Sequence, residues 1–283
     1  MSWFELSLAS MTLYGIQAFL FRVAAQKKCD SSLLLFFFML SAGSLALLMY
    51  LLNPSRILNF RYLFFYAILQ VIFYLFRQIA KIEAMKYIPG IVALPITATQ
   101  GLITVILGIC LLQEKITVVQ SLGIILAFIV ILILSREKEK ERKLRNIKLG
   151  VMLAISAAIL GGIVNFIIKL AAPIINPFLF ISISYYFALL PSYLFYRLEM
   201  LSTKTKRIES IKLGIYSGVV NFLAFSLFLL ALAQGPVSII VPLVDLNLLL
   251  AVILIVVIYK EKPTLPRILG VFGAIIATIL LRG

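Results

Sequence analysis

The sequence consists of long apolar runs that are separated by short polar segments. The runs are about as long as the 18 to 20 residues that a helix needs to cross the hydrocarbon core of a bilayer. No stretch alternates polar and apolar residues in the manner of a membrane β-barrel. The pattern predicts an all-α polytopic membrane protein with ten spans, at about residues 3–24, 31–52, 62–84, 91–113, 118–135, 149–171, 177–196, 211–233, 237–259 and 265–281.

The ten predicted spans form two matching sets of five. One constant shift of 147 residues, without gaps, places Pro89 on Pro236, Pro95 on Pro242, Glu114 on Glu261, Gly123 on Gly270 and Gly15 on Gly162. These matches are more informative than matches of leucine or isoleucine, because proline restricts the backbone, glycine frees it and glutamate carries a charge. Because five is odd, the second set must enter the bilayer upside down. The sequence therefore predicts two inverted five-helix repeats, residues 1–134 and 149–283, joined by a charged linker, residues 135–148.

Inverted repeats are the architecture of secondary transporters, whose substrate sites lie near the bilayer midplane between the repeats. The alternative is a duplicated structural membrane protein without transport activity.

Composition supports the membrane assignment. The chain is 63% hydrophobic with a mean hydropathy of +1.12, and only 13% of its residues are charged, against about 25% in soluble domains. It has no histidine, which excludes histidine-based catalysis and histidine metal ligands, and two cysteines are too few for a disulfide framework. We expect no metal, no cofactor and no nucleic-acid partner; the net charge of +15 is attributed to loops that face the cytoplasm.

Two segments match each other at the ends of the two repeats: "AMKYIPGIVALPI…LLQEKITVVQSLGIILAFIVILIL" and "ALAQGPVSIIVPLV…VIYKEKPTLPRILGVFGAIIATILL". With these segments the chain resembles the drug/metabolite transporter superfamily, in particular its ten-span EamA-type members, over its whole length. Tyr14-Gly15 also fits the aromatic-glycine pair of the family's first span. The resemblance implies a permease of the plasma membrane for metabolites such as amino acids, nucleotide sugars or sugar phosphates.

The basic residues predict the orientation of the chain. Outside the spans, four lysines and arginines fall on the side of both termini, and eighteen fall on the other side, seven of them in the linker. The positive-inside rule therefore predicts that the linker 135–148 is cytoplasmic and that both termini lie outside.

Burying an ionisable side chain within a membrane span costs free energy, and ionisable residues in the spans are therefore candidates for function. Arg77 and Asp245 lie deepest, and the repeat places them on Ala224 and Ala98, so neither charge is duplicated. Arg77 can bind a carboxylate or phosphate, and Asp245, three residues after Pro242, can bind an amino group or carry a coupling proton. The alternative is that the two simply pair with each other. Arg22, Lys81 and Glu83 lie near span ends, where long side chains reach water.

The remaining substrate-binding candidates are polar residues within the predicted spans. They are Tyr14, Tyr74, Gln78, Gln100, Asn165, Lys169, Asn221 and Asn247. Some of them can instead make hydrogen bonds between helices. Pro95 and Pro242 are expected to kink spans four and nine, either for gating or as static bends.

The Glu-Lys pairs at residues 114–115 and 261–262 end the fourth span of each repeat. We predict that Glu114 and Glu261 are structural, near the exposed starts of spans five and ten. Thr117 and Gln120 form a predicted capping box, and Thr264 is a predicted cap. Gly214 and Gly218 are expected to allow close helix packing.

The sequence therefore predicts a secondary transporter of small polar metabolites, which are amino acids or related anionic or zwitterionic solutes. The expected direction of transport is export. A coupling proton or ion is a further expected partner, beside the lipid bilayer. A sugar-phosphate or nucleotide-sugar exchanger and a lipid-carrier flippase share the architecture and stay open. An enzyme acting on lipid-linked substrates is a third alternative, but the chain lacks paired acids for it. The sequence leaves the oligomeric state open and is compatible with a monomer.

Overall fold

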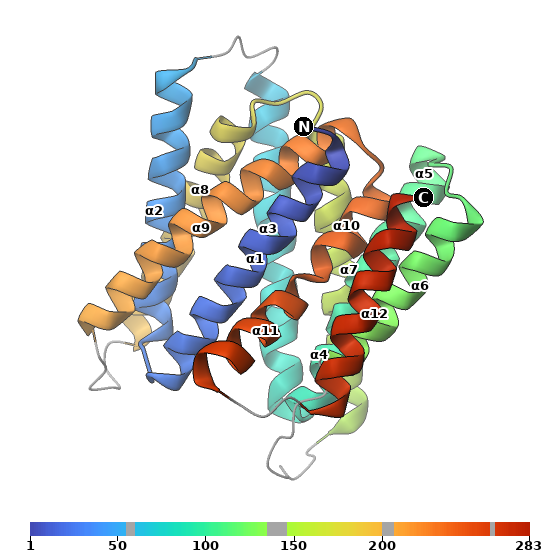
Figure 1. Ribbon diagram of the computed structural model, residues 1–283. Coiled ribbons are helices and arrows are strands. Elements are labelled where there is room, and N and C mark those ends of the chain that lie inside the picture. The colour runs from blue at the N-terminus through green and yellow to red at the C-terminus, as the bar shows by residue number, and fades with distance from the viewer. Residues whose placement is uncertain (55–59, 135–145, 200–206, 261–263) are drawn as a thin grey trace.

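The computed structural model describes residues 1–54, 60–134, 146–199, 207–260 and 264–283. These residues form twelve α-helices (Figure 1): α1 (Trp3–Gln26), α2 (Ser31–Leu52), α3 (Phe60–Tyr87), α4 (Gly90–Ala98), α5 (Gln100–Leu112), α6 (Val118–Leu134), α7 (Ile147–Ala171), α8 (Pro177–Glu199), α9 (Arg207–Gln234), α10 (Val237–Asp245), α11 (Asn247–Tyr259) and α12 (Leu265–Arg282). The all-α prediction is confirmed.

The predicted spans correspond to these helices. Within the described residues, eight segments are long and apolar enough to cross a membrane, and two shorter apolar helices, Val118–Leu134 and Pro177–Leu189, accompany them. Spans four and nine are each divided into two half-helices, α4–α5 and α10–α11. Twelve helices therefore make ten spans, as the sequence predicts.

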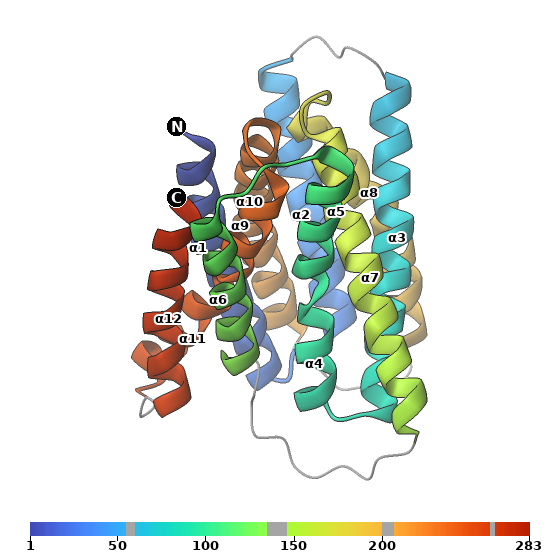
Figure 2. The same ribbon diagram turned by 90° about the vertical axis from the view of Figure 1, so that its right-hand side faces the viewer.

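The inverted repeat is visible in the backbone. The breaks in spans four and nine fall at Thr99 and Leu246, which the shift of 147 residues superimposes. Gln113 and Lys260, a second equivalent pair, both adopt the left-handed conformation that ends a helix, with φ of 54° and 51°. In Figures 1 and 2 both termini lie at the top, and the ends of α6 and α7 that flank the charged linker lie at the bottom. We call these two faces the termini side and the linker side.

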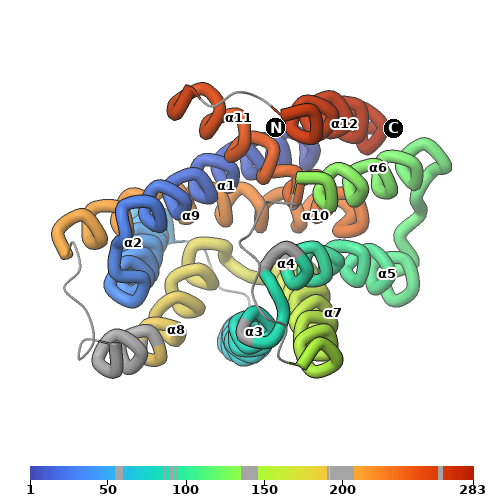
Figure 3. The backbone as a smooth tube through the Cα atoms, turned by 90° about the horizontal axis from the view of Figure 1, so that it is seen from below, coloured from blue at the N-terminus to red at the C-terminus, as the bar shows by residue number. Residues whose placement is uncertain are grey.

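The two repeats interlock. The helix α1 packs along α9 and its counterpart α7 packs along α3, while α2 lies against α8 and α6 lies against α12, as Figure 3 shows from the linker side. Gly214 and Gly218 of α9 make the predicted close contact, since a Cβ on either would stand 2.6 and 2.5 Å from a carbonyl oxygen of α2. Small residues at helix crossings thus bring the repeats together.

The predicted capping box of α6 is present, and the predicted cap residue of α12 lies at the cap position. Thr117 and Gln120 form the capping box. The backbone N–H of Gln120 donates to Thr117 Oγ1 over 3.2 Å, and the backbone N–H of Thr117 donates to the side-chain oxygen Oε1 of Gln120 over 3.0 Å. Thr264 occupies the N-cap position of α12 as predicted, but its side chain makes no capping hydrogen bond. Pro266 in the first turn supports the helix start instead, because its fixed φ suits that position. Glu261 and residues 135–145 of the linker lie outside the described residues.

Candidate functional site

A pocket of about 350 Å³ lies at the centre of the bundle between the two repeats. Helices α1, α2 and α3 line it together with α5 and α7 to α11. Nine of the ten substrate-binding residues predicted from the sequence are in its wall: Tyr14, Tyr74, Arg77, Gln78, Gln100, Asn165, Asn221, Asp245 and Asn247. The tenth, Lys169, is not. Polar residues that are up to 233 positions apart in the chain, from Tyr14 to Asn247, thus meet in one cavity because the repeats interlock.

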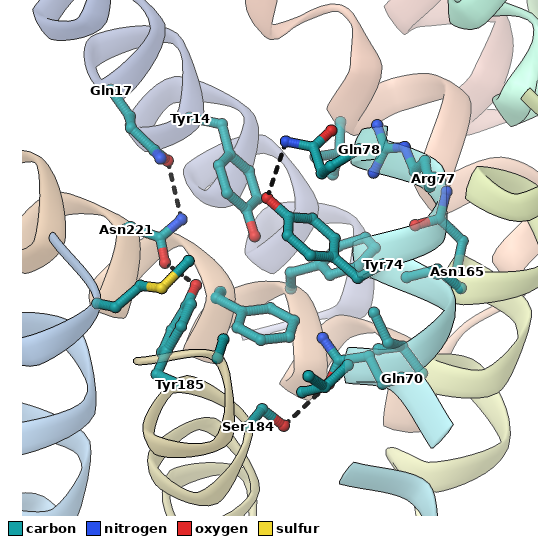
Figure 4. Close-up of a pocket in the computed structure, with 18 of the residues that line it drawn as sticks. Tyr14, Gln17, Gln70, Tyr74, Arg77, Gln78, Asn165, Ser184, Tyr185 and Asn221 are labelled. Atoms are coloured by element: carbon teal, nitrogen blue, oxygen red, sulfur yellow. Dashed lines mark hydrogen bonds between the residues drawn. The ribbon is translucent and has the colours of Figure 1, made fainter. Parts of the chain in front are cut away.

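Hydrogen bonds between neighbouring helices hold one side of the pocket (Figure 4). The Asn221 amide donates to Gln17 Oε1 over 2.9 Å, and the Tyr185 hydroxyl donates to Asn221 Oδ1, which connects α1, α9 and α8. Ser184 donates to Gln70 Oε1 over 2.9 Å, which joins α8 to α3. These polar groups are satisfied within the protein, and they fix the shape of the wall.

Aromatic rings form much of the remaining wall. Tyr14 meets Phe228 edge to face, with ring centroids 6.4 Å apart, and Tyr185 lies between Phe38 and Phe225 at 5.8 and 6.3 Å. In Figure 4 the Tyr14 and Tyr74 rings point toward one another across the cavity. The pocket therefore offers apolar and aromatic surface beside its polar groups, as small-molecule sites commonly do.

The breaks of spans four and nine meet beside this pocket. Asp245 is the last residue of α10, and Gly101 in the first turn of α5 makes room for its carboxylate: a Cβ at Gly101 would stand 2.7 Å from Asp245 Oδ2. Helix C-termini carry partial negative charge, which adds to that of the Asp245 side chain. The C-terminal end of α10 and the Asp245 carboxylate therefore both place negative charge at the crossing of the two broken spans, where half-helix C-termini coordinate coupling ions in other transporters.

Two acceptor atoms at this crossing are left without hydrogen bonds. Among the described residues, Asp245 Oδ2 and Gln100 Oε1 are buried and have no donor within reach. Burying a polar group without a partner costs roughly 1–3 kcal/mol in proteins, and more when it is charged. Both residues line the pocket. A ligand that brings N–H or O–H donors would therefore satisfy these two oxygens.

Arg77 stands in the same wall but does not pair with Asp245. Both lie in the described part of the chain, and no nitrogen of Arg77 comes within the 4.0 Å of Asp245 that defines an ion pair. The guanidinium instead lies over the Tyr74 ring, 5.9 Å from its centroid. Gly161 of α7 makes room for it, since a Cβ there would stand 3.1 Å from Arg77 Nε and would overlap Gln100 Oε1. The direct pairing weighed as an alternative is therefore absent, and both charges remain available in the pocket.

Lys169 and Glu114 lie together on the termini side, away from the pocket. The Lys169 ammonium donates to the carbonyl oxygens of Leu232 and Gly235, over 2.7 and 2.6 Å, where α9 ends. Lys169 thus caps the C-terminal end of α9, and it does not line the pocket.

Glu114 has a different helix partner from the predicted one. Its carboxylate accepts from the backbone amides of Val237 and Ser238, over 2.8 and 2.9 Å, and from the Ser238 hydroxyl. Glu114 therefore caps α10 in the opposite repeat, and not the start of α6. The reason is that Pro236 at the N-cap of α10 has no side chain that can accept these hydrogen bonds.

Sequence reasoning missed several lining residues, among them Gln70, Ser184 and Tyr185. One signal could have found Gln70: it shares a helical face with Tyr74, Arg77 and Lys81, at spacings of three and four residues. Tyr185 is the repeat counterpart of Phe38, and both line the pocket. A search for polar or aromatic residues that recur on one face of a span would have found both.

Comparison with known proteins identifies the group to which this molecule belongs. The family model described as "EamA-like transporter family" matches residues 1–136 and, again, residues 148–283. The chain belongs to the EamA-like transporter family. It is accordingly a multi-pass membrane transporter of the drug/metabolite type, with a small-molecule substrate.

Solved structures agree with the EamA-like fold. One, described as "Crystal structure of protein", shares 17% identity and a TM-score of 0.74, over 98% of each chain. At that identity the likeness shows the fold alone. A search of the curated proteins finds no significant match.

Proposed function

We propose that this EamA-like transporter moves small zwitterionic or anionic metabolites, such as amino acids, out across the plasma membrane by alternating access. One observation carries the proposal: a carboxylate, Asp245, and a guanidinium, Arg77, face one central pocket without pairing with each other. An α-amino acid carries the complementary pair of charges, an ammonium group for Asp245 and a carboxylate for Arg77. A lipophilic cation would leave Arg77 without a partner.

The polar and apolar walls supply the remaining contacts. Gln100 Oε1 beside Asp245 gives a second acceptor for an ammonium group, and Gln78 and Asn247 lie in the same wall. The rings of Tyr14, Phe38 and Phe228 offer apolar surface for a side chain. A pocket of about 350 Å³ lies within the usual size range of small-molecule sites.

The residues at the two ends of the pocket differ in burial, and this difference is compatible with the export that we propose. On the termini side Leu232, Val237 and Ile240 are fully buried. On the linker side the lining includes Leu35, which is 37% exposed, and the half-buried Phe21. If the linker is cytoplasmic, as the basic residues predict, the less buried end of the pocket is the cytoplasmic one. Rocking of one repeat against the other would then expose the pocket to the outside.

The substrate class is tested by counterflow into proteoliposomes that are preloaded with unlabelled amino acids. We expect exchange of at least one labelled amino acid. The same amino acid without its carboxylate, or without its amino group, should compete about tenfold less well, because each loses one charge-assisted contact. Exchange of sugar phosphates but of no amino acid would overturn the proposed substrate class.

A further inference from the structure

A second cavity, of about 460 Å³, lies next to the central pocket. Four residues line both: Arg77, Gln100, Asp245 and Asn247. The rest of its wall comes from the linker-side halves of α1, α3 and α6, together with the first turns of α11 and the end of α4. We call it the linker-side pocket. The central pocket thus continues toward the linker side through the crossing of the two broken spans.

Three cationic side chains line the linker-side pocket: Arg22, Arg77 and Lys81. Arg77 and Lys81 are four residues apart on α3, so they project from the same helix face and repel each other. Both are half-buried. Within the described residues, neither has a carboxylate at ion-pair distance, although Asp245 faces the same cavity.

Such an arrangement favours the binding of an anion. A charged side chain inside a membrane span ordinarily pairs with an opposite charge or faces a water-filled path. Here two neighbouring cations on one helix face share a cavity, and Arg22 brings a third positive charge to its wall from α1. An anionic group in the cavity would screen the repulsion between Arg77 and Lys81. The volume leaves room for that group and several waters, at about 30 Å³ each.

We propose that the linker-side pocket is a second anion-binding site, in which Arg22 and Lys81 hold a carboxylate or phosphate group before it reaches Arg77. The site rests on the proposed function and deepens it, because it would deliver the acidic group of the solute to Arg77, while the anion binding itself can be measured without transport. A solute with an acidic group would be concentrated here and passed along α3 by one helical turn, from Lys81 to Arg77. The headgroup of an anionic lipid offers the same chemistry as a free anion.

The first test measures binding of radiolabelled inorganic phosphate to the purified full-length protein in a neutral detergent. Saturable binding is expected. Lys81→Gln should weaken it about tenfold, since each lost charge-assisted hydrogen bond has roughly that effect. Lys212→Gln, which removes the same charge from an exposed position on α9, should leave it unchanged. Equal weakening in both variants, or no saturable binding, would overturn the proposal.

Further variants separate charge from folding. Lys81→Arg keeps the positive charge and should keep binding within about threefold, because both side chains serve as phosphate ligands. Asp245→Asn removes a negative charge from the same cavity and should tighten phosphate binding. If Lys81→Gln melts at the wild-type temperature and still binds phosphate as tightly as wild type, the site assignment fails.

The two sources of the anion are separated by repeating the titration in nanodiscs. Discs of phosphatidylcholine alone should bind phosphate as the detergent sample does. Competition by added phosphatidylglycerol would make a lipid headgroup the occupant, and absence of competition would make it a free solute. Failure is also distinguishable from failure of the proposed function: if amino-acid counterflow is intact and phosphate does not bind, only this second site falls.

Discussion

At the scale of single residues, charge and depth in the membrane predicted residues of the pocket wall, but they did not predict the partners of Glu114 and Lys169. Arg77 and Asp245 could be chosen from the sequence because burying an ionisable group deep in a membrane span costs free energy, and such groups mark functional sites. Glu114 and Lys169 could not be placed, because their partners lie in another helix: Glu114 caps α10, more than 120 residues further along the chain. No local pattern encodes such a contact.

The Glu114 cap makes a prediction about stability. Glu114→Ala should lower the unfolding free energy by about 2 kcal/mol, since it removes charge-assisted hydrogen bonds to two amides at a helix start. Melting of the purified protein in detergent measures the change. Glu5→Ala is the matched control, because Glu5 is an exposed capping-box residue at the start of α1. A larger loss in Glu5→Ala than in Glu114→Ala would contradict the assigned role.

At the scale of helices, the repeat predicted the division of the chain, and the prolines marked the two spans that break. Pro95 and Pro242 both lie inside the first half-helix, and the breaks follow four residues later, at Thr99 and Leu246. A kink was predicted from each proline because proline removes one helical hydrogen bond. The division into separate half-helices could not be foreseen from the sequence. The residues that begin the second half-helices, Gln100 of α5 and Asn247 of α11, lie in the wall of the pocket, and their surroundings come from helices distant in the sequence.

Helix packing makes the next prediction. Gly218→Ala should destabilise the protein by about 2 kcal/mol, because its new methyl group would stand 2.5 Å from the Phe38 carbonyl oxygen of α2 and force the helices apart. Gly43→Ala is the control, since the nearest atom there is 3.3 Å away. Helix propensity alone favours both changes by about 1 kcal/mol. Equal melting temperatures for the two variants would contradict the close packing of α2 and α9.

At the scale of the whole molecule, a nearly symmetric scaffold surrounds an asymmetric site. The backbone repeats at one constant shift, down to the left-handed caps at Gln113 and Lys260. The side chains in the pocket do not: Tyr14 corresponds to Gly161, and Asp245 corresponds to Ala98. The symmetric part was predictable from the sequence because glycine, proline and span length carry it. The walls of the site were only partly predictable, because residues such as Ser184 and Tyr185 have no charge that marks them in a span.

The orientation of the whole molecule is a separate prediction. With 18 basic residues on the linker side and four on the termini side, the C-terminus should lie outside the cytoplasm. Alkaline phosphatase, which folds only outside the cytoplasm, should be active when fused after Gly283, and green fluorescent protein fused there should stay dark. The reverse pair of results would contradict the orientation and, with it, the proposed direction of export.

The central claim is that Arg77 and Asp245 together bind the transported solute. The most direct measurement is amino-acid counterflow into proteoliposomes that contain wild type, Arg77→Gln, Asp245→Asn or the exposed control Lys212→Gln. Each pocket variant should lose at least about tenfold in exchange rate, because it removes one charge-assisted contact to the solute, while the control keeps the wild-type rate. Wild-type exchange rates in both Arg77→Gln and Asp245→Asn would contradict the account.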